Sequence, residues 1–367
     1  MKKVLSLLLV IAQCVLFCSC DSDESEGRSI RKKQTTANSK GQYYFVKEIK
    51  TYSTHDVLVG ERLIEFDKNG FPLEWRGSRP YGYGCVIKYD SDYSVSSIKY
   101  GFDAREGMYD NYYEYDEYGN VTFESRVWED FESSVKYKYK YENGCVIEEV
   151  SYSGENTFYK LWSDYDKNGN VTSMKSERWH YWEGEVINHG LWSCSFEYDK
   201  HNNLIGIYMD EEKWLNVDEN GREKIDYELE PYLWKEFEYD ADGNLNFVVE
   251  YMENEKIASQ TFEYDSMGRV VSFLCKWYFE DGRCQEQYKE YEYDKTGRVV
   301  QECIYEDDEL VEYKEFIYCE TPVTLNNAQV KVFHEEGLLK LDYIKIDHGA
   351  ALLNLYGWAG TEKEVFY

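Results

Sequence analysis

Proline and basic residues are scarce in this sequence, and several catalytic signatures are missing from it. The 367 residues include only 4 Pro, and 41 Lys and Arg stand against 71 Asp and Glu, so the formal net charge is −30. A surface of that charge repels polyanions, which argues against nucleic acid as a partner. The 6 His form no His-x-x-x-His pair, and there is no Gly-x-Ser-x-Gly elbow or glycine-rich phosphate loop. We therefore predict no enzymatic activity, no metal and no cofactor.

Tyrosine is abundant instead, with 37 copies, and it alternates with charged residues. In the segment Tyr291–Tyr293 two rings flank a Glu, which places both rings on one face of an extended strand. Asp294 then begins a turn that Gly297 closes in the left-handed backbone conformation, as in a hairpin with a three-residue loop. A Cβ costs about 1–2 kcal/mol there, least for Asn. We therefore expect Asn203 to replace Gly in one copy.

This hairpin segment recurs along most of the chain. Its acidic markers lie 23 to 41 residues apart, at Asp67, Asp90, Asp116, Glu142, Asp166, Asp199, Asp240, Asp265 and Asp294. Two strands per repeat at such a period are typical of repeat arrays. Because an isolated hairpin is marginal in water, neighbouring repeats must stack their Tyr rows. We predict an all-β antiparallel meander of about twenty strands that forms a curled open sheet, a spiral or a partly closed barrel.

The Tyr-Asp-x-x-Gly-(Asn/Arg)-(Val/Leu) box resembles the YD repeat of RHS-type proteins over roughly residues 60–320. Large members of that family carry a self-cleaving core segment and a variable toxin tail, and this sequence shows neither. The resemblance therefore implies the repeat architecture without the toxin-delivery role.

The N-terminus predicts export and lipid attachment. After two Lys, the apolar run from Val4 to Phe17 is too short to span a membrane. The next residues resemble a bacterial lipobox, with small Ser19 before Cys20, which we expect to be acylated. An ordinary signal peptide with an incidental Cys is the alternative. The acidic stretch 21–26 resembles the signal that sends Bacteroidetes lipoproteins to the outer face of the outer membrane. In other bacteria an Asp after the Cys resembles an inner-membrane retention mark.

Four regions follow from these features. We expect a signal peptide over 1–19, the acylated Cys with a flexible tether over 20–41, the repeat array over 42–324 and a C-terminal β cap over 325–367. Pro72 lies on a return strand, which suits a sheet edge or the end of the array. Cys275 and Cys303 fall at matching places in successive repeats, so they predict either a bridge between neighbouring strands or two small buried side chains.

Five Trp concentrate in the two longest repeats, at Trp179, Trp182, Trp192, Trp214 and Trp234. Exposed rings among carboxylates are typical of a sugar-binding surface, since a ring stacks on a pyranose face. Alternatively, longer hairpins bury more rings against each other.

The function we expect is a non-enzymatic outer-membrane lipoprotein that presents an acidic, aromatic-rich sheet to a glycan or a protein partner. An envelope scaffold without a ligand is the first alternative. A glycan hydrolase is the second, and it would need two carboxylates about 5–10 Å apart, one of them desolvated.

Overall fold

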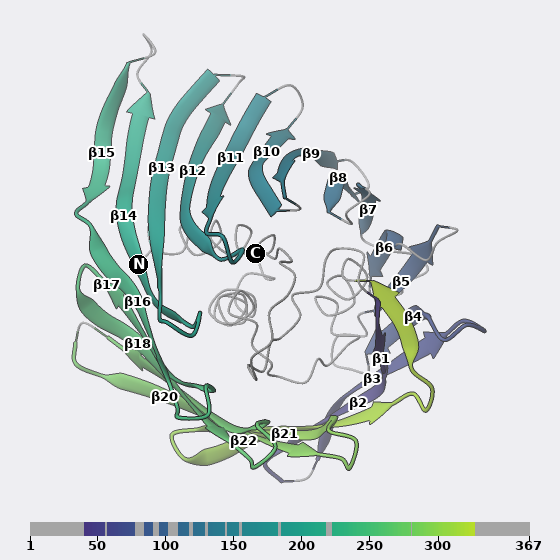
Figure 1. Cartoon of the computed structure of the whole chain (residues 1–367). Helices are drawn as coiled ribbons and strands as arrows, with labels where there is room; N and C mark the ends of the chain where they lie inside the picture. The colour runs from purple at the N-terminus through teal and green to yellow at the C-terminus, as the bar shows by residue number, and fades with distance from the viewer. Residues whose placement is uncertain are drawn as a thin grey trace.

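The computed structural model describes residues 40–326, apart from gaps at 56, 78–83, 91–94, 102–108, 117–119, 129–130, 144, 154–155, 183–184, 218–221 and 280. The predicted signal peptide, Cys20, nearly all of the tether and almost the whole predicted C-terminal cap lie outside these residues. Every regular element in the described part is a β-strand (Figure 1). No described helix is long and apolar enough to cross a membrane.

The strands follow one another in chain order. They are β1 (Lys40–Tyr43), β2 (Val46–Ser53), β3 (Leu58–Phe66), β4 (Pro72–Gly77), β5 (Gly84–Tyr89), β6 (Val95–Gly101), β7 (Tyr109–Tyr115), β8 (Val121–Trp128), β9 (Phe131–Glu142), β10 (Cys145–Ser153), β11 (Asn156–Tyr165), β12 (Val171–Trp182), β13 (Glu185–Tyr198), β14 (Leu204–Val217), β15 (Glu223–Leu229), β16 (Tyr232–Tyr239), β17 (Leu245–Met252), β18 (Glu255–Tyr264), β19 (Val270–Tyr278), β20 (Cys284–Tyr293), β21 (Val299–Glu306), β22 (Glu309–Tyr318) and β23 (Val323–Asn326).

Strands β2 to β22 form one antiparallel meander that closes into a barrel (Figure 1). Closure occurs where β2 pairs with β22 on one side and with β3 on the other. Both β15 and β16 pair with β14, along successive parts of it, so the 21 strands occupy 20 positions around the barrel. The short strands β1 and β23 pair with each other in a separate two-stranded sheet. The predicted all-β antiparallel meander is confirmed, in its barrel form.

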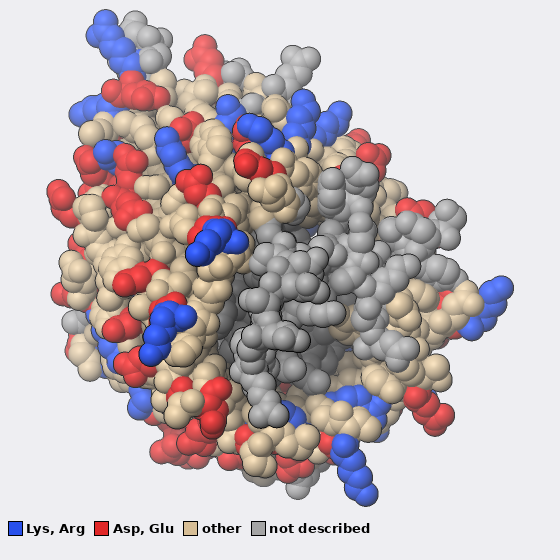
Figure 2. Space-filling model, viewed as in Figure 1, with Lys and Arg blue, Asp and Glu red and all other residues tan. Residues whose placement is uncertain are grey.

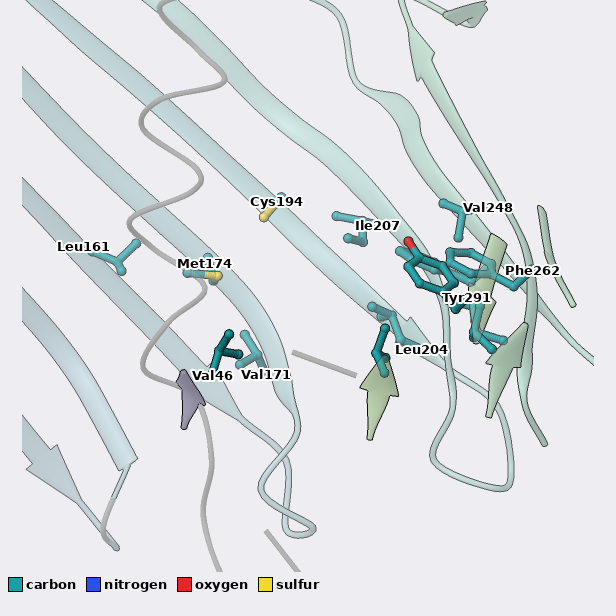
Figure 3. Close-up of a cluster of buried hydrophobic side chains, with 14 of the residues drawn as sticks. Val46, Leu161, Val171, Met174, Cys194, Leu204, Ile207, Val248, Phe262 and Tyr291 are labelled. Atoms are coloured by element: carbon teal, nitrogen blue, oxygen red, sulfur yellow. The ribbon is translucent and has the colours of Figure 1, made fainter. Parts of the chain in front are cut away.

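Most strands bury one face and expose the other. On β20, Lys289 and Tyr291 are buried while Glu290 and Glu292 are exposed. Because the barrel is a single layer and no described element covers it from outside, the buried face is the inner one. Figure 3 shows part of the hydrophobic cluster on this face. Figure 2 shows acidic side chains, with basic ones among them, across the outer surface.

The recurrent Asp organises the turn at one end of each repeat. In the copy that starts at Asp265, carboxylate Oδ1 accepts the backbone N–H groups of Met267 at 2.8 Å and Arg269 at 3.0 Å. Oδ2 accepts Nε of the same Arg269 at 2.7 Å. Other repeats have Asn instead of Arg at this position, and its side-chain amide makes the same bond: Asn244 donates to Oδ2 of Asp240 at 2.9 Å. This shared bond explains why the repeat has either Arg or Asn there.

The turn closes at a residue with positive φ, which is Gly in five copies with φ between 74° and 89°. In the copy that begins at Asp199, Asn202 takes this position with φ 67°. The prediction of Asn203 was therefore wrong by one residue. The side-chain amide of Asn203 instead donates to Asp199 Oδ2 at 3.1 Å, as Asn244 does in its own turn.

The Tyr of the box ties each repeat to the one before it. The hydroxyl of Tyr264 donates to the backbone carbonyl of Leu245, the first residue of β17, at 2.6 Å. Five further Tyr, each the last residue of its strand, make the same kind of bond to the start of an earlier return strand at 2.7–2.9 Å: Tyr165, Tyr198, Tyr239, Tyr293 and Tyr318. In the repeat marked by Glu142, Tyr139 inside β9 makes this bond to Val121 at 2.8 Å. Each such bond contributes about 0.5–1.5 kcal/mol. The motif thus encodes contact between repeats as well as a turn.

Two further expectations need correction. Pro72 does not mark an edge, because β4 pairs with β3 and with β5. It is tolerated as the first residue of its strand, and its carbonyl accepts a hydrogen bond from the Tyr89 hydroxyl. Cys275 and Cys303 form no bridge, since both thiols are free. Cys275 pairs in register with Gln287 and Cys303 with Glu290, so the two thiols lie on opposite faces of the sheet.

Candidate ligand-binding wall

The two longest repeats build the tallest part of the barrel. Strands β12, β13 and β14 contain 12 to 14 residues, whereas β16 to β22 contain 8 to 10. The first part of β14 pairs with β16, and the part beyond it pairs with β15. We call β12–β15 the tall wall and β16–β22 the short wall (Figure 1).

The five predicted Trp do not form one surface. Trp192 and Trp234 are 5% exposed and belong to the core, so neither is the exposed platform that the sequence suggested. Trp214 is partly buried and lies on the inner face, opposite Gly190. Trp179 pairs with His189, which is next to Gly190 on β13. Because neighbouring residues of a strand point to opposite faces and Gly190 is on the inner face, Trp179 lies on the outer face. The side chain of Trp182 lies outside the described part of the chain.

The upper part of the inner face combines an aromatic ring with polar groups. Arg178, Gly190 and Trp214 stand opposite one another on β12, β13 and β14. The Trp214 ring lies against Gly190, where an added Cβ would be 3.0 Å from ring atoms, so a larger residue there would press on the ring. The His180 ring is 5.7 Å from Trp214 between centroids. Burial first, and then Arg178, lower the pKa of His180, which keeps its imidazole neutral at pH 7.

The row below contains three buried polar groups in register. Ser176 on β12 pairs with Trp192 on β13, which pairs with Glu212 on β14, and the three are 0%, 5% and 4% exposed. Ser176 Oγ, Trp192 Nε1 and Glu212 Oε2 each find no hydrogen-bond partner among the described residues. Buried polar atoms are paired in the great majority of cases, so three in adjacent positions are unusual. We call Ser176, Trp192 and Glu212 the unpaired row.

The surroundings of Glu212 are acidic. Burial first, and then the nearby carboxylate of Glu253, raise the pKa of Glu212 to about 7. Burial, followed by Glu212 and Glu253, raises the pKa of Tyr227 to about 12. Near neutral pH a large fraction of Glu212 is therefore protonated, and its carboxyl group can then both donate and accept a hydrogen bond.

On the outer face of the tall wall, Trp179 and His189 make several contacts with their neighbours, although His189 Nε2 finds no hydrogen-bond partner among the described residues. The Trp179 ring stacks on His189 at 5.0 Å, with 12° between the ring planes. Lys160 Nζ lies 5.7 Å from the centroid of the Trp179 ring. His189 Nδ1 is 3.1 Å from Glu223 Oε1, which fastens β15 to β13. These contacts use the Trp179 ring to hold the wall together.

Hydrogen bonding and ring contact are thus the chemistry that the inner face offers. No group of His, Cys, Asp and Glu among the described residues has the arrangement of a metal site. The sequence pointed to the tall wall through its Trp, but it did not single out Ser176, Arg178 or Glu212. Their shared face depends on strand register, which β-bulges shift between Ser193 and Cys194 and between His180 and Tyr181.

No protein-family model and no curated protein matches this chain. Among solved structures it is similar to TcdB2-TccC3 without its hypervariable C-terminal region, at 13% identity and a TM-score of 0.25. That match covers 73% of this chain but spans only 16% of the other chain. A porin-like protein from Bacteroides uniformis is 11% identical with a TM-score of 0.27, covering 75% of this chain and 96% of that one. A porin-like protein from Bacteroides vulgatus is 13% identical with a TM-score of 0.24, covering 55% and 98%. Likenesses at this level carry no information on function.

Proposed function

We propose that this chain is a non-enzymatic, surface-anchored lipoprotein of the RHS/YD-repeat type whose barrel binds a glycan on the inner face of the tall wall. The observation that carries the proposal is the Trp214 ring, held against Gly190 beside His180 and Arg178. A fixed aromatic ring with polar groups around it is how proteins bind a sugar, whose ring has an apolar face and a hydroxyl rim.

The exposure of the side chains along the inner face of the tall wall supports entry of a ligand from the rim of the barrel. Asn216, near the end of β14, is exposed, and Asn188 opposite it is partly buried. Trp214 is also partly buried, while Glu212 is only 4% exposed. The polar groups therefore extend from solvent at the rim to the unpaired row below, a gradient that suits the end of a chain-like ligand.

The outer surface supports anchoring through an acylated Cys20 at the outer membrane. A barrel inserted in a bilayer carries an apolar band around its outside. Here the outward residues in the middle of strands include Lys50, whose amine is 3.0 Å from Glu48, and Glu315, which accepts the Tyr52 hydroxyl at 3.1 Å. Such a surface suits water, so the lipid on Cys20 would hold the barrel at the membrane.

Binding of polysaccharides by the full-length acylated protein in detergent tests the proposal. We expect one or more glycans to bind, and Trp214→Ala to weaken binding about tenfold because the ring contact is lost. Trp179→Ala, on the outer face, is the matched control and should change affinity less than twofold. No binding to any glycan, or equal binding by Trp214→Ala, would contradict the proposal.

Two alternative functions are each supported by one observation. The closed barrel, with its paired strands, is compatible with an envelope scaffold that needs no ligand. The hydrolase alternative is favoured by Glu212, a desolvated carboxyl group with a second carboxylate, Glu253, near enough to raise its pKa. Release of reducing ends by the unmodified protein, lost in Glu212→Gln, would replace the binding role with that activity.

A further inference from the structure

We infer that the unpaired row, Ser176, Trp192 and Glu212, determines the specificity of the tall wall and takes a hydroxyl-bearing, uncharged sugar unit. This inference rests on the proposed glycan binding and names the class of glycan. It begins from three polar atoms on three neighbouring strands in direct register, which are buried and have no hydrogen-bond partner in the part of the chain that the structure describes.

The three atoms have different requirements. Trp192 Nε1 is a donor only, so it needs an acceptor. Glu212 Oε2 is an acceptor, and when Glu212 is protonated its carboxyl group also donates. Ser176 Oγ does both. A hydroxyl group can satisfy all three, because it donates and accepts through the same oxygen.

Charged ligand groups fit the row poorly. A carboxylate or sulfate can accept from Trp192 and Ser176, but its charge would be repelled by the carboxylate of Glu253, and by Glu212 whenever Glu212 is ionised. An ammonium group suits Glu212 but has no acceptor for the Trp192 indole N–H. Uncharged sugars should therefore bind better than uronates, sulfated sugars and amino sugars.

The cost of leaving these atoms unpaired also argues for a ligand. A buried polar atom without a partner destabilises the fold, and apolar residues of similar shape would remove that cost. The same barrel does pair buried polar groups elsewhere, as Lys289 does with Glu302 at 3.2 Å. Retained unpaired groups on the face that carries Trp214 are consistent with bonds that are completed by a bound molecule.

Substitutions that remove the polar atoms and keep most of the apolar bulk test the row. Trp192→Phe deletes the N–H, and Glu212→Leu deletes the carboxyl group, while Glu212→Gln keeps one donor and one acceptor. Affinity would be measured on the full-length acylated protein in detergent, with dextran, mannan, laminarin and xyloglucan as uncharged probes. Polygalacturonate and chondroitin sulfate would be the acidic probes, and chitosan the cationic one.

We expect an uncharged glycan to bind most tightly, and Trp192→Phe and Glu212→Leu to weaken it about 5- to 10-fold, which is the loss of one buried hydrogen bond. Glu212→Gln should stay within about twofold of the parent. Glu212→Leu should melt at the same temperature as the parent or higher, because it removes a buried unpaired carboxyl group, whereas Trp192→Phe should melt slightly lower because it leaves a small cavity in the core. A purely structural role for the row would instead lower the melting temperature of Glu212→Leu.

The possible results separate this inference from the proposed function. If a glycan binds and Trp214→Ala weakens it, but Trp192→Phe and Glu212→Leu bind as the parent does, ordered water fills the row and the inference is wrong while the function stands. Preference for the acidic or cationic probes would also overturn it. If no glycan binds, both the function and the inference fail.

Discussion

The inner faces of the two walls treat buried polar groups in opposite ways. On the short wall, Lys289 and Glu302 are both about 5% exposed and form an ion pair, and buried Lys235 lies 3.3 Å from Glu250. On the tall wall, the unpaired row leaves an indole N–H, a hydroxyl and a carboxyl oxygen without hydrogen bonds. The same repeat therefore supports two uses of its inner face: one wall completes its own polar contacts, and the other leaves them open.

For uncharged polar groups, the two walls differ only in how deeply the unpaired side chains are buried. Two amide oxygens of the short wall, in Gln260 and Gln287, also lack a partner among the described residues. Both side chains are only partly buried, whereas Ser176, Trp192 and Glu212 are each at least nine-tenths buried. Removing an interaction should therefore be costly on the short wall and nearly free on the tall wall.

Breaking the short-wall ion pair should have the largest effect. Lys289→Met leaves Glu302 buried without its cationic partner, and we expect a loss of about 3–5 kcal/mol in the free energy of unfolding. The double variant Lys289→Met/Glu302→Leu should recover most of that loss, because no buried charge then remains. Denaturant unfolding of the full-length protein in detergent measures both. Glu212→Leu on the tall wall is the control and should cost nothing. A loss below about 1 kcal/mol for the single variant would erase the contrast between the walls.

The pH dependence of stability should separate the two kinds of carboxyl group. An unfolded Glu titrates near pH 4.3, and the folded pKa of Glu212 is raised to about 7 by burial and Glu253. Between these values the folded protein binds more protons, so Glu212 makes stability fall as pH rises, by up to about 1.4 kcal/mol per pH unit. The turn carboxylates act at lower pH with the opposite sign. Burial opposes ionisation of Asp294, but hydrogen bonds from Thr296 and Arg298 outweigh it and lower the pKa to about 2.

Unfolding free energies of the parent and of Glu212→Gln between pH 3 and 9 test this sign. The advantage of the Gln variant should grow from about pH 4 to 7 and then level off. The contribution of Asp294 should be present above about pH 4 and disappear as pH falls toward 2, equally in both proteins. A difference between the two proteins that does not change with pH would show that Glu212 ionises normally.

The sequence predicted those features of the fold that depend on residues close together in the chain, and it missed those that depend on distant residues. Asp-x-x-Gly turns and alternating Tyr are local, so the hairpins and the meander were readable from segments such as Tyr291–Gly297. Closure of the barrel could not be predicted in this way, because the pairing of β2 with β22 joins residues 259 to 272 positions apart. The Pro72 error has a different cause: β4 is interior through its neighbours β3 and β5 whether or not the barrel closes, and Pro is tolerated there as the first residue of the strand.

Only part of the candidate site could be predicted from the sequence, for a related reason. Clustered Trp in expanded repeats identified the tall wall, but face and burial depend on register. A bulge between Ser193 and Cys194 changes which residues of β14 face β13, so Glu212 could not be aligned with Trp192 in advance. The hydrogen-bonding role of the box Tyr was also missed, because its acceptor lies in the preceding repeat.

Substitutions in the turns should affect the two walls alike. Their expected effect on the free energy of unfolding is the smallest of those considered. Asp265→Ala on the short wall removes the acceptor of two backbone N–H groups, and we expect it to cost about 1–2 kcal/mol of unfolding free energy. Asp199→Ala, at the β13–β14 turn of the tall wall, removes the same bonds to His201 and Asn203 and should cost the same.

Asp242→Ala is the control for both turn variants, because this exposed side chain makes no hydrogen bond of that kind, and we expect a change below about 0.5 kcal/mol. Denaturant unfolding of the full-length protein measures all three. A much smaller cost at Asp199 than at Asp265 would mean that the walls differ in their turns as well. Equal costs would confine the difference to the inner faces of the strands, where substitution of one wall's polar groups disturbs the fold and substitution of the other's disturbs only binding.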